Sequence, residues 1–146
     1  MFLNKKTKDK LKQTVTIITL LLYIIQPTLT FAADIVVDNN ADINKQATLD
    51  KAANNVTVVQ ITTPTAAGVS HNVFKEFNVD QQGLILNNSK IVAQTKLAGY
   101  ITGNPNLTGN NARVILNEIS GTNPSYLKGY TEIAGVKADV IVANPN

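Results

Sequence analysis

Short apolar segments rich in β-branched residues recur along the chain from residue 35 onward. They are bounded by Asn, Gly, Pro or Asp, a pattern typical of short strands separated by turns. The segments are residues 35–37, 56–61, 84–86, 114–116 and 140–142. Residues 47–54, which follow Asn44, are compatible with a short helix, but no stretch keeps a helical apolar period over three turns. The pattern therefore predicts an all-β fold.

The chain also contains an internal sequence repeat. Residues 84–87 resemble 114–117, and residues 97–100 resemble 127–130 at the same spacing, while a third strand–Asn unit, 140–144, follows after a shorter step. Such repeats suggest stacked units, none of which can bury its apolar face alone. Asn tolerates the left-handed backbone at a corner, and stacked Asn side chains can bond along the stack. A β-solenoid and a β-sandwich both fit, and the solenoid explains the Asn corners better.

The first residues have the three parts of a secretory signal peptide. A lysine-rich head extends to Lys12, an apolar core covers residues 15–25, Pro27 follows, and small residues surround Ala32. We predict cleavage after Ala32, with Ala33 as the second choice, so residues 1–32 form the signal peptide. An uncleaved membrane anchor is the alternative, because the stretch after Lys12 carries no charge up to Ala33, but Pro27 and its polar neighbours dilute the second half. We expect export by the Sec machinery.

Charge and composition exclude several classes of binding partner and reactive site. Five of the thirteen basic residues lie in the lysine-rich head, and beyond residue 32 eight basic residues face nine acidic ones, with Arg113 the one arginine. Nucleic acid is therefore not an expected partner. The sequence has no Cys and one His, His71. Disulfides, thiol catalysis, Cys-ligated zinc and His-cluster metal sites are excluded, so we expect no catalytic residue, cofactor or metal.

Three ordered segments resemble the secretion domain of two-partner secretion (TPS) exoproteins, the filamentous-haemagglutinin-like adhesins and contact-dependent growth-inhibition toxins of Gram-negative bacteria. The first, residues 69–89, contains Phe74, Phe77 and Asn78. The second is the NPNL motif, Asn104, Pro105, Asn106 and Leu107. The third runs over residues 112–121 and 138–146 and ends in Asn144, Pro145 and Asn146, the start of the family's NPNGI motif. The resemblance covers residues 33–146.

The resemblance implies a right-handed parallel β-helix, a single-stranded solenoid with an N-terminal cap. Residues 140–146 run from a strand into a turn, so we expect the chain to be a C-terminally truncated fragment of a longer exoprotein. The implied role is secretion: periplasmic POTRA domains of an outer-membrane β-barrel transporter recognise this domain, and the exoprotein is secreted through the barrel. Its first coils then template β-helix folding at the cell surface or in the extracellular space. Any contact with host or bacterial cells is expected in the downstream region.

Two interpretations of the NPNL motif remain open. Asn-Pro-Asn favours a type I turn with Pro at its second position, so the motif is either a corner that fixes a coil or a direct contact of the transporter. The same alternatives apply to Asn144, Pro145 and Asn146. Phe74 and Phe77 are expected in the core, because Phe buries a large area.

Two other functions are less well supported. A β-helical polysaccharide lyase would need clustered acids for calcium together with a basic residue, whereas the nine acids beyond residue 32 are scattered. A carbohydrate- or cell-binding adhesin module would need an aromatic platform, and the chain has no Trp and four Tyr. We therefore expect a non-enzymatic secretion module.

Overall fold

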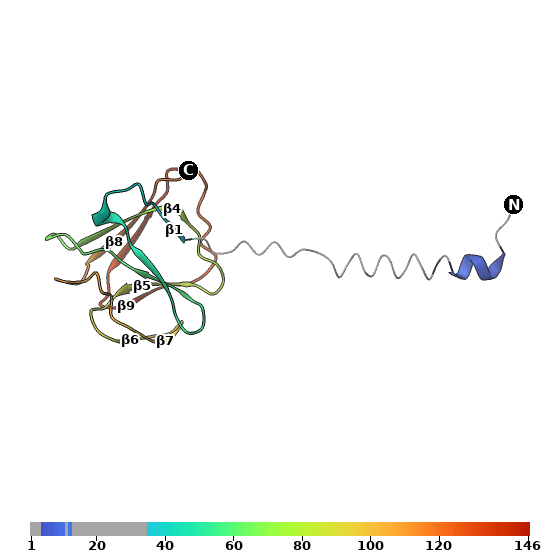
Figure 1. Cartoon of the computed structure of the whole chain (residues 1–146), viewed down its shortest axis with the longest axis horizontal. Coiled ribbons are helices and arrows are strands. Elements are labelled where there is room, and N and C mark those ends of the chain that lie inside the picture. Colours follow the sequence, from blue (N-terminus) through green and yellow to red (C-terminus); the bar gives the residue numbers. More distant parts are fainter. Residues whose placement is uncertain (1–3, 11, 13–34) are drawn as a thin grey trace. The chain divides into compact units, whose positions relative to one another are not determined.

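A computed structural model describes residues 4–10, 12 and 35–146, which fall into two units that are treated separately (Figure 1). In the first unit the lysine-rich segment is helical over residues 5–10 and at residue 12. The Asn4 side chain accepts a hydrogen bond from the Thr7 N–H at 3.0 Å, so Asn4 caps this helix. The predicted apolar core of the signal peptide and the cleavage positions Ala32 and Ala33 lie outside the described residues. Within the described ranges, no helix is long and apolar enough to cross a membrane.

Residues 35–146 form ten short strands and one 3-10 turn, and the five apolar segments of the sequence fall in β1, β3, β5, β8 and β10. The elements are β1 (Ile35–Val37), η1 (Ile43–Lys45), β2 (Thr48–Lys51), β3 (Thr57–Gln60), β4 (Val69–Phe77), β5 (Leu84–Asn88), β6 (Ala93–Thr95), β7 (Gly99–Ile101), β8 (Val114–Ile119), β9 (Thr131–Gly135) and β10 (Asp139–Ala143). Strands β1-β4-β8-β10 form sheet A, strands β2-β3-β5-β9 form sheet B, and β6 and β7 form a separate hairpin.

Parallel pairing within each sheet builds a stack of coils. In sheet A, Val69 of β4 lies beside Val114 of β8, which lies beside Asp139 of β10; β3, β5 and β9 are paired in the same parallel way in sheet B. The chain therefore alternates between sheets, with β3–β4, β5–β8 and β9–β10 as successive coils. In Figure 1, β1, β4 and β8 lie above β5 and β9. A parallel bridge between Val79 and Leu127 joins neighbouring coils at a third side. This arrangement is a parallel β-helix.

The first coil is covered by an N-terminal cap. Strands β1 and β2 pair antiparallel with β4 and β3, so they occupy the N-terminal edges of both sheets. The short helix expected over residues 47–54 is wrong, because Thr48–Lys51 is the edge strand β2. All four of its residues are exposed, which leaves no buried face to stabilise a short helix, whereas pairing with β3 satisfies the backbone of this segment.

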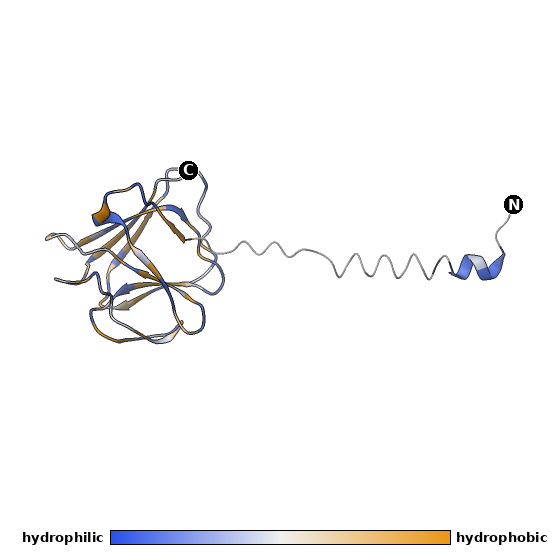
Figure 2. Cartoon of the chain, viewed as in Figure 1, coloured by the Kyte–Doolittle hydropathy of each residue, from blue (hydrophilic) through white to orange (hydrophobic). Residues whose placement is uncertain are grey.

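Two apolar cores contain the buried apolar side chains of the strands. One core fills the β-helix and includes Phe74 and Phe77, whose rings meet edge to face at 5.1 Å. The second lies between sheet B and the β6–β7 hairpin, where Ile101 packs with Val58 and Ile85. The central strands of sheet B, β3 and β5, are therefore buried on both faces. Figure 2 shows the hydrophobic colouring concentrated along the strands.

The internal sequence repeat does not correspond to the structural repeat of the coils. Residues 84–87 lie in sheet B and residues 114–117 in sheet A, so the two copies are not stacked. The stacked amides are instead Asn87 with Gln60, at 2.9 Å, and Asn72 with Asn117, at 3.3 Å. The hairpin inserted between β5 and β8 makes the coils unequal in length, which breaks any single period. The ladder in sheet A stops at Asn117, because Val142 occupies the next position.

The second pair of similar segments, residues 97–100 and 127–130, does not occupy equivalent packing positions either. Tyr100 lies in β7 of the hairpin, and Tyr130 directly precedes β9. Both side chains are more than half exposed, so the Gly-Tyr pairs are not matched core positions.

Candidate functional site

The NPNL motif forms a tight turn after β7. The Leu107 N–H donates to the Asn104 carbonyl at 3.2 Å, which closes the turn with Pro105 and Asn106 at its centre. The Asn104 Oδ1 accepts from the Asn106 N–H at 2.8 Å and fixes the same turn from the side chain. Pro105 has no N–H, and its ring restricts φ to the value that the second turn position needs.

Asn104 also ties two coils together. Its side chain is buried, and Nδ2 donates to the Ile61 carbonyl at 2.9 Å and to the Asn87 carbonyl at 2.8 Å. Ile61 follows β3 and Asn87 lies in β5, so one amide bridges the ends of two stacked strands. The Asn104 N–H adds a bond to the Ser89 carbonyl at 2.7 Å. Asn104 therefore has the contacts of a corner that fixes the coil.

The remaining residues of the motif divide between the core and the surface. Leu107 is buried in the core of the β-helix, whereas Pro105 is exposed. Asn106 is half-buried, and its Nδ2 donates to the Gln60 carbonyl at 3.1 Å. The Asn106 carbonyl accepts from the Thr63 hydroxyl. The motif thus presents Pro105 and part of Asn106 to solvent, held in place by two buried neighbours.

The second Asn-Pro-Asn sequence repeats this local geometry near the surface. The Asn144 Oδ1 accepts from the Asn146 N–H at 3.0 Å, as Asn104 does in the first motif. The Asn144 Nδ2 donates to the Asn123 carbonyl at 3.1 Å and to the Ser125 hydroxyl at 2.9 Å, and the Asn146 Nδ2 donates to the Gly121 carbonyl at 2.7 Å. Pro145 is exposed. This corner is tied to the loop between β8 and β9.

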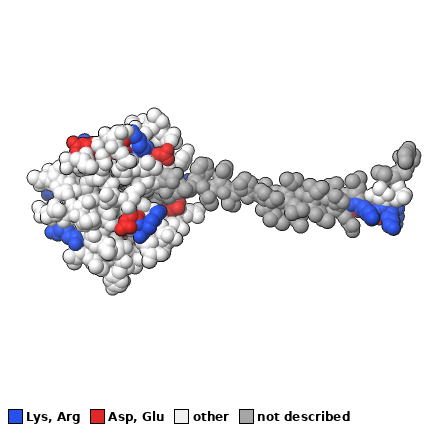
Figure 3. Space-filling model, viewed as in Figure 1, with Lys and Arg blue, Asp and Glu red and all other residues white. Residues whose placement is uncertain are grey.

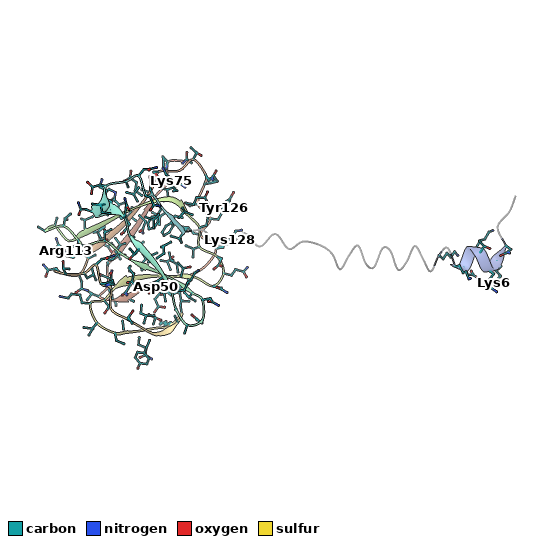
Figure 4. All side chains as sticks on the ribbon, viewed as in Figure 1. Lys6, Asp50, Lys75, Arg113, Tyr126 and Lys128 are labelled. Carbon is teal, nitrogen blue, oxygen red and sulfur yellow. The ribbon has the colours of Figure 1, made fainter. Side chains whose placement is uncertain are left out.

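Asn78, which the sequence analysis named in the segment 69–89, positions the coil that follows. It lies directly after β4, and its Oδ1 accepts from the Tyr126 N–H at 2.9 Å. Tyr126 and Lys128 lie beside each other in Figure 4, and the Lys128 ammonium is 5.4 Å from the centre of the Tyr126 ring. Asn78 therefore acts across coils as Asn104 does, but at the third side of the helix.

The sequence analysis did not identify Asp38, a buried carboxylate that connects the N-terminal cap to the first coils. The Asp38 side chain is 7% exposed; it lies 3.0 Å from the Lys75 ammonium and accepts from the Ser120 hydroxyl at 2.6 Å. It also accepts from the Asn40 N–H at 2.9 Å. The hydrogen bonds from Ser120, Asn40 and Lys75 lower the pKa of Asp38 from 3.8 to about 2. The one available signal was an Asp at the end of a strand, where such residues often begin a turn.

His71 and Glu118, which the sequence analysis did not connect, contact each other on sheet A. The Nε2 of His71 in β4 is 2.6 Å from the Glu118 carboxylate in β8, because the parallel register places these strands side by side. Sequence reasoning treated both residues as isolated. Within residues 4–10, 12 and 35–146, no three His, Cys, Asp or Glu side chains gather as metal ligands would.

Comparison with known proteins shows the family to which this β-helix belongs. A family model described as the TPS secretion domain matches residues 33–146. The chain belongs to this family. The crystal structure of a filamentous hemagglutinin secretion domain is similar, with a TM-score of 0.68 and 40% identity over 77% of this chain and 35% of that one. The predicted fold class, an all-β parallel β-helix, is confirmed by this likeness together with the parallel sheets.

The similar relatives are very large proteins. The chain is 49% identical over 113 residues to the toxin CdiA of Yersinia pestis, 54% over 101 residues to a tRNA nuclease CdiA of Escherichia coli, and 47% over 116 residues to a hemolysin of Serratia marcescens. These matches cover 77%, 68% and 80% of the chain, but only 3% of each CdiA protein and 7% of the hemolysin.

Membership gives residues 33–146 their general role. TPS secretion domains are non-catalytic secretion and targeting modules of large exoproteins, which Gram-negative bacteria export to the cell surface or beyond it. The family implies a cognate outer-membrane transporter. The prediction of a secretion module is therefore confirmed. The nuclease activities in the relatives' names belong to those whole proteins.

Proposed function

We propose that residues 33–146 are the part of an exported exoprotein that the periplasmic POTRA domains of its cognate transporter recognise. In this proposal residues 1–32 direct Sec-dependent export to the periplasm and are cleaved after Ala32 or Ala33. The exoprotein then crosses the outer-membrane barrel, and its first coils template the folding of those that follow.

The observation that carries the proposal is the capped stack of parallel coils. Each coil contacts only its neighbours, so folding can begin at one end and propagate along the chain. Strands β1 and β2 close the N-terminal end, and Asp38 joins this cap to Lys75 in β4 and to Ser120 directly after β8. The first coils are thus closed on one side, and β9 and β10 are the last strands of the two sheets on the other.

The test is secretion of the chain from cells that either contain or lack the cognate transporter. We expect the chain in the medium only when the transporter is present, with the Asn104→Ala variant strongly reduced. Retention of a stable wild-type chain in the periplasm under both conditions would overturn the proposal. N-terminal sequencing of the secreted chain would locate the cleavage position.

A further inference from the structure

The two strands of the N-terminal cap differ in how far along the chain their partners lie. Strand β2 pairs with β3, the next strand, so Thr48 lies beside Gln60. Strand β1 pairs with β4, so Ile35 lies beside Phe77 across a much longer stretch of chain. Contacts between distant segments cost more loop entropy than local contacts and form later in folding. We therefore expect the β2 half of the cap to form before the β1 half.

Strand β1 has little packing of its own to hold it on the first coil. Of its three residues Ile35 alone is fully buried, and its register with β4 shifts between Val36 and Val37. One buried side chain does little to offset the conformational entropy that is lost when the strand becomes ordered. The attachment of β1 therefore depends on the residue that follows it, Asp38, whose N–H donates to the Val73 carbonyl at 3.0 Å.

The Asp38 carboxylate contacts both the first and the second coil. It lies 3.0 Å from the ammonium of Lys75 in β4, a side chain labelled in Figure 4, and it accepts from the Ser120 hydroxyl at 2.6 Å. Ser120 directly follows β8, and β4 lies between β1 and β8 in sheet A, so Ser120 reaches Asp38 across β4. The hydrogen bond from Ser120 contributes most to the lowered pKa of Asp38. The second coil thus supplies a main anchor of the cap.

The chain after β8 fits closely against β4 at this point. The Ser120 N–H donates to the Phe74 carbonyl at 2.8 Å. The next residue is Gly121, and a Cβ at this position would overlap the Lys75 carbonyl oxygen. Glycine therefore allows the backbone to approach β4. Pairing of β8 with β4 places the Ser120 hydroxyl within reach of Asp38, and no further loop has to become ordered.

Charged side chains on the surface are widely spaced. Figure 3 shows those of the visible face in small separate groups with uncharged surface between them. Exposed charges more than about 8 Å apart are largely screened at physiological ionic strength. The direct contacts of Asp38, and not a wider field of charge, therefore determine how firmly β1 is held.

We propose that Asp38, Lys75 and Ser120 form a latch that closes the β1 half of the cap only after the second coil has stacked on the first. We call these three residues the cap latch. A first coil by itself leaves β1 without the bond from Ser120, and the arrival of β8 adds a coil and closes the cap in one step. The stable template is therefore two coils with a closed cap. The third coil joins at the same corner, because the Asn146 Nδ2 donates to the Gly121 carbonyl at 2.7 Å. The role of the latch in secretion rests on the proposed function, in which the first coils template those that follow.

The loop after β8 offers a matched pair of serines for the test. The Ser120 hydroxyl donates to the cap, whereas the Ser125 hydroxyl accepts from the Asn144 Nδ2, directly after β10, at 2.9 Å. We would measure amide hydrogen exchange of the purified chain, with the Asp38 N–H reporting on the β1 half of the cap and the Ala52 N–H, which is bonded across the β2–β3 turn, reporting on the β2 half. Ser120→Ala should speed exchange at Asp38 about tenfold, because a hydrogen bond to a charged group is lost, and should leave Ala52 unchanged. Ser125→Ala should leave both amides unchanged.

Pulsed hydrogen exchange during refolding tests the order of the steps. We expect the Ala52 N–H to become protected first, and the Asp38 N–H together with or after the Ser120 N–H, which reports on the docking of β8 against β4. Ser120→Ala should raise the unfolding rate and leave the refolding rate unchanged, because the latch closes late.

Three results would overturn the inference: protection of Asp38 before Ser120, exchange at Asp38 that Ser120→Ala does not change, or an equal acceleration at Asp38 and Ala52, which would mean that the whole fold is weakened. These measurements need no transporter. Secretion that does not depend on the transporter would refute the proposed function and leave the latch in place.

Discussion

Replacing Asn104 by Ala is the sharpest test of the NPNL corner. The change removes three side-chain hydrogen bonds: the two that Nδ2 donates to the Ile61 and Asn87 carbonyls, and the one that Oδ1 accepts from Asn106. The site is buried, so water cannot easily replace the lost partners. The side chain also carries the link between β3 and β5, so the loss falls on the contact between two coils.

The magnitude follows from the number and burial of these bonds. A hydrogen bond in a folded protein contributes about 1 kcal/mol net, and leaving a buried group without a partner costs about 1–3 kcal/mol. We therefore expect Asn104→Ala to lower the free energy of unfolding by about 3 kcal/mol. That is a large share of the roughly 5–15 kcal/mol that typical domains possess.

The assay is urea unfolding of the purified chain, with Asn144→Ala as the control. Asn144 makes the same turn bond, but it is half-buried and its partner Asn123 is exposed, so water can replace what is lost. We expect a cost below about 1 kcal/mol for Asn144→Ala. Equal unfolding midpoints for the wild type and Asn104→Ala would refute the reasoning, as would a larger loss in the control.

Three further predictions, one of them with its own control variant, test other parts of the structure. Phe77→Ala should lower the unfolding free energy by about 3–5 kcal/mol in urea, because the side chain is fully buried against Phe74. Gly129→Ala should cost about 1–3 kcal/mol, since its Cβ would strike the Asp80 carbonyl, while Gly109→Ala, whose Cβ meets open space, should leave the melting temperature unchanged. The pKa of Asp38 falls from 3.8 to about 2 on folding, so its carboxylate stabilises the fold above pH 3.8, and this contribution disappears as the pH falls toward 2. Asp38→Asn should therefore flatten the fall of the unfolding midpoint over that pH window, and an unchanged slope would contradict the assignment.

Much of the fold could be predicted from the sequence because its signals are local. Short β-branched segments bounded by turn residues identified five of the ten strands, β1, β3, β5, β8 and β10, and Asn-Pro-Asn predicted the turn at residues 104–107. The edge strand β2 was missed, because Thr48–Lys51 has no apolar pattern and takes its conformation from pairing with β3. The repeat was misjudged because the inserted hairpin shifts the register between sheets, and local similarity carries no information on which sheet a strand joins.

The site was less predictable for the same reason. Asn104 could be placed in a turn, but not against Ile61 and Asn87, which depends on the stacking of coils. The ion pair of Asp38 with Lys75 and the contact of His71 with Glu118 each join distant segments whose proximity only the register creates.

The burial of Asn104 makes a secretion defect at this position ambiguous, and the other variants resolve it. Asn104→Ala, Phe77→Ala and Gly129→Ala weaken the fold at three separate places. If secretion falls in proportion to stability for all three, the buried half of the motif acts through the fold. An Asn104→Ala variant that loses secretion far beyond what Phe77→Ala loses at equal stability would instead assign recognition to the corner itself.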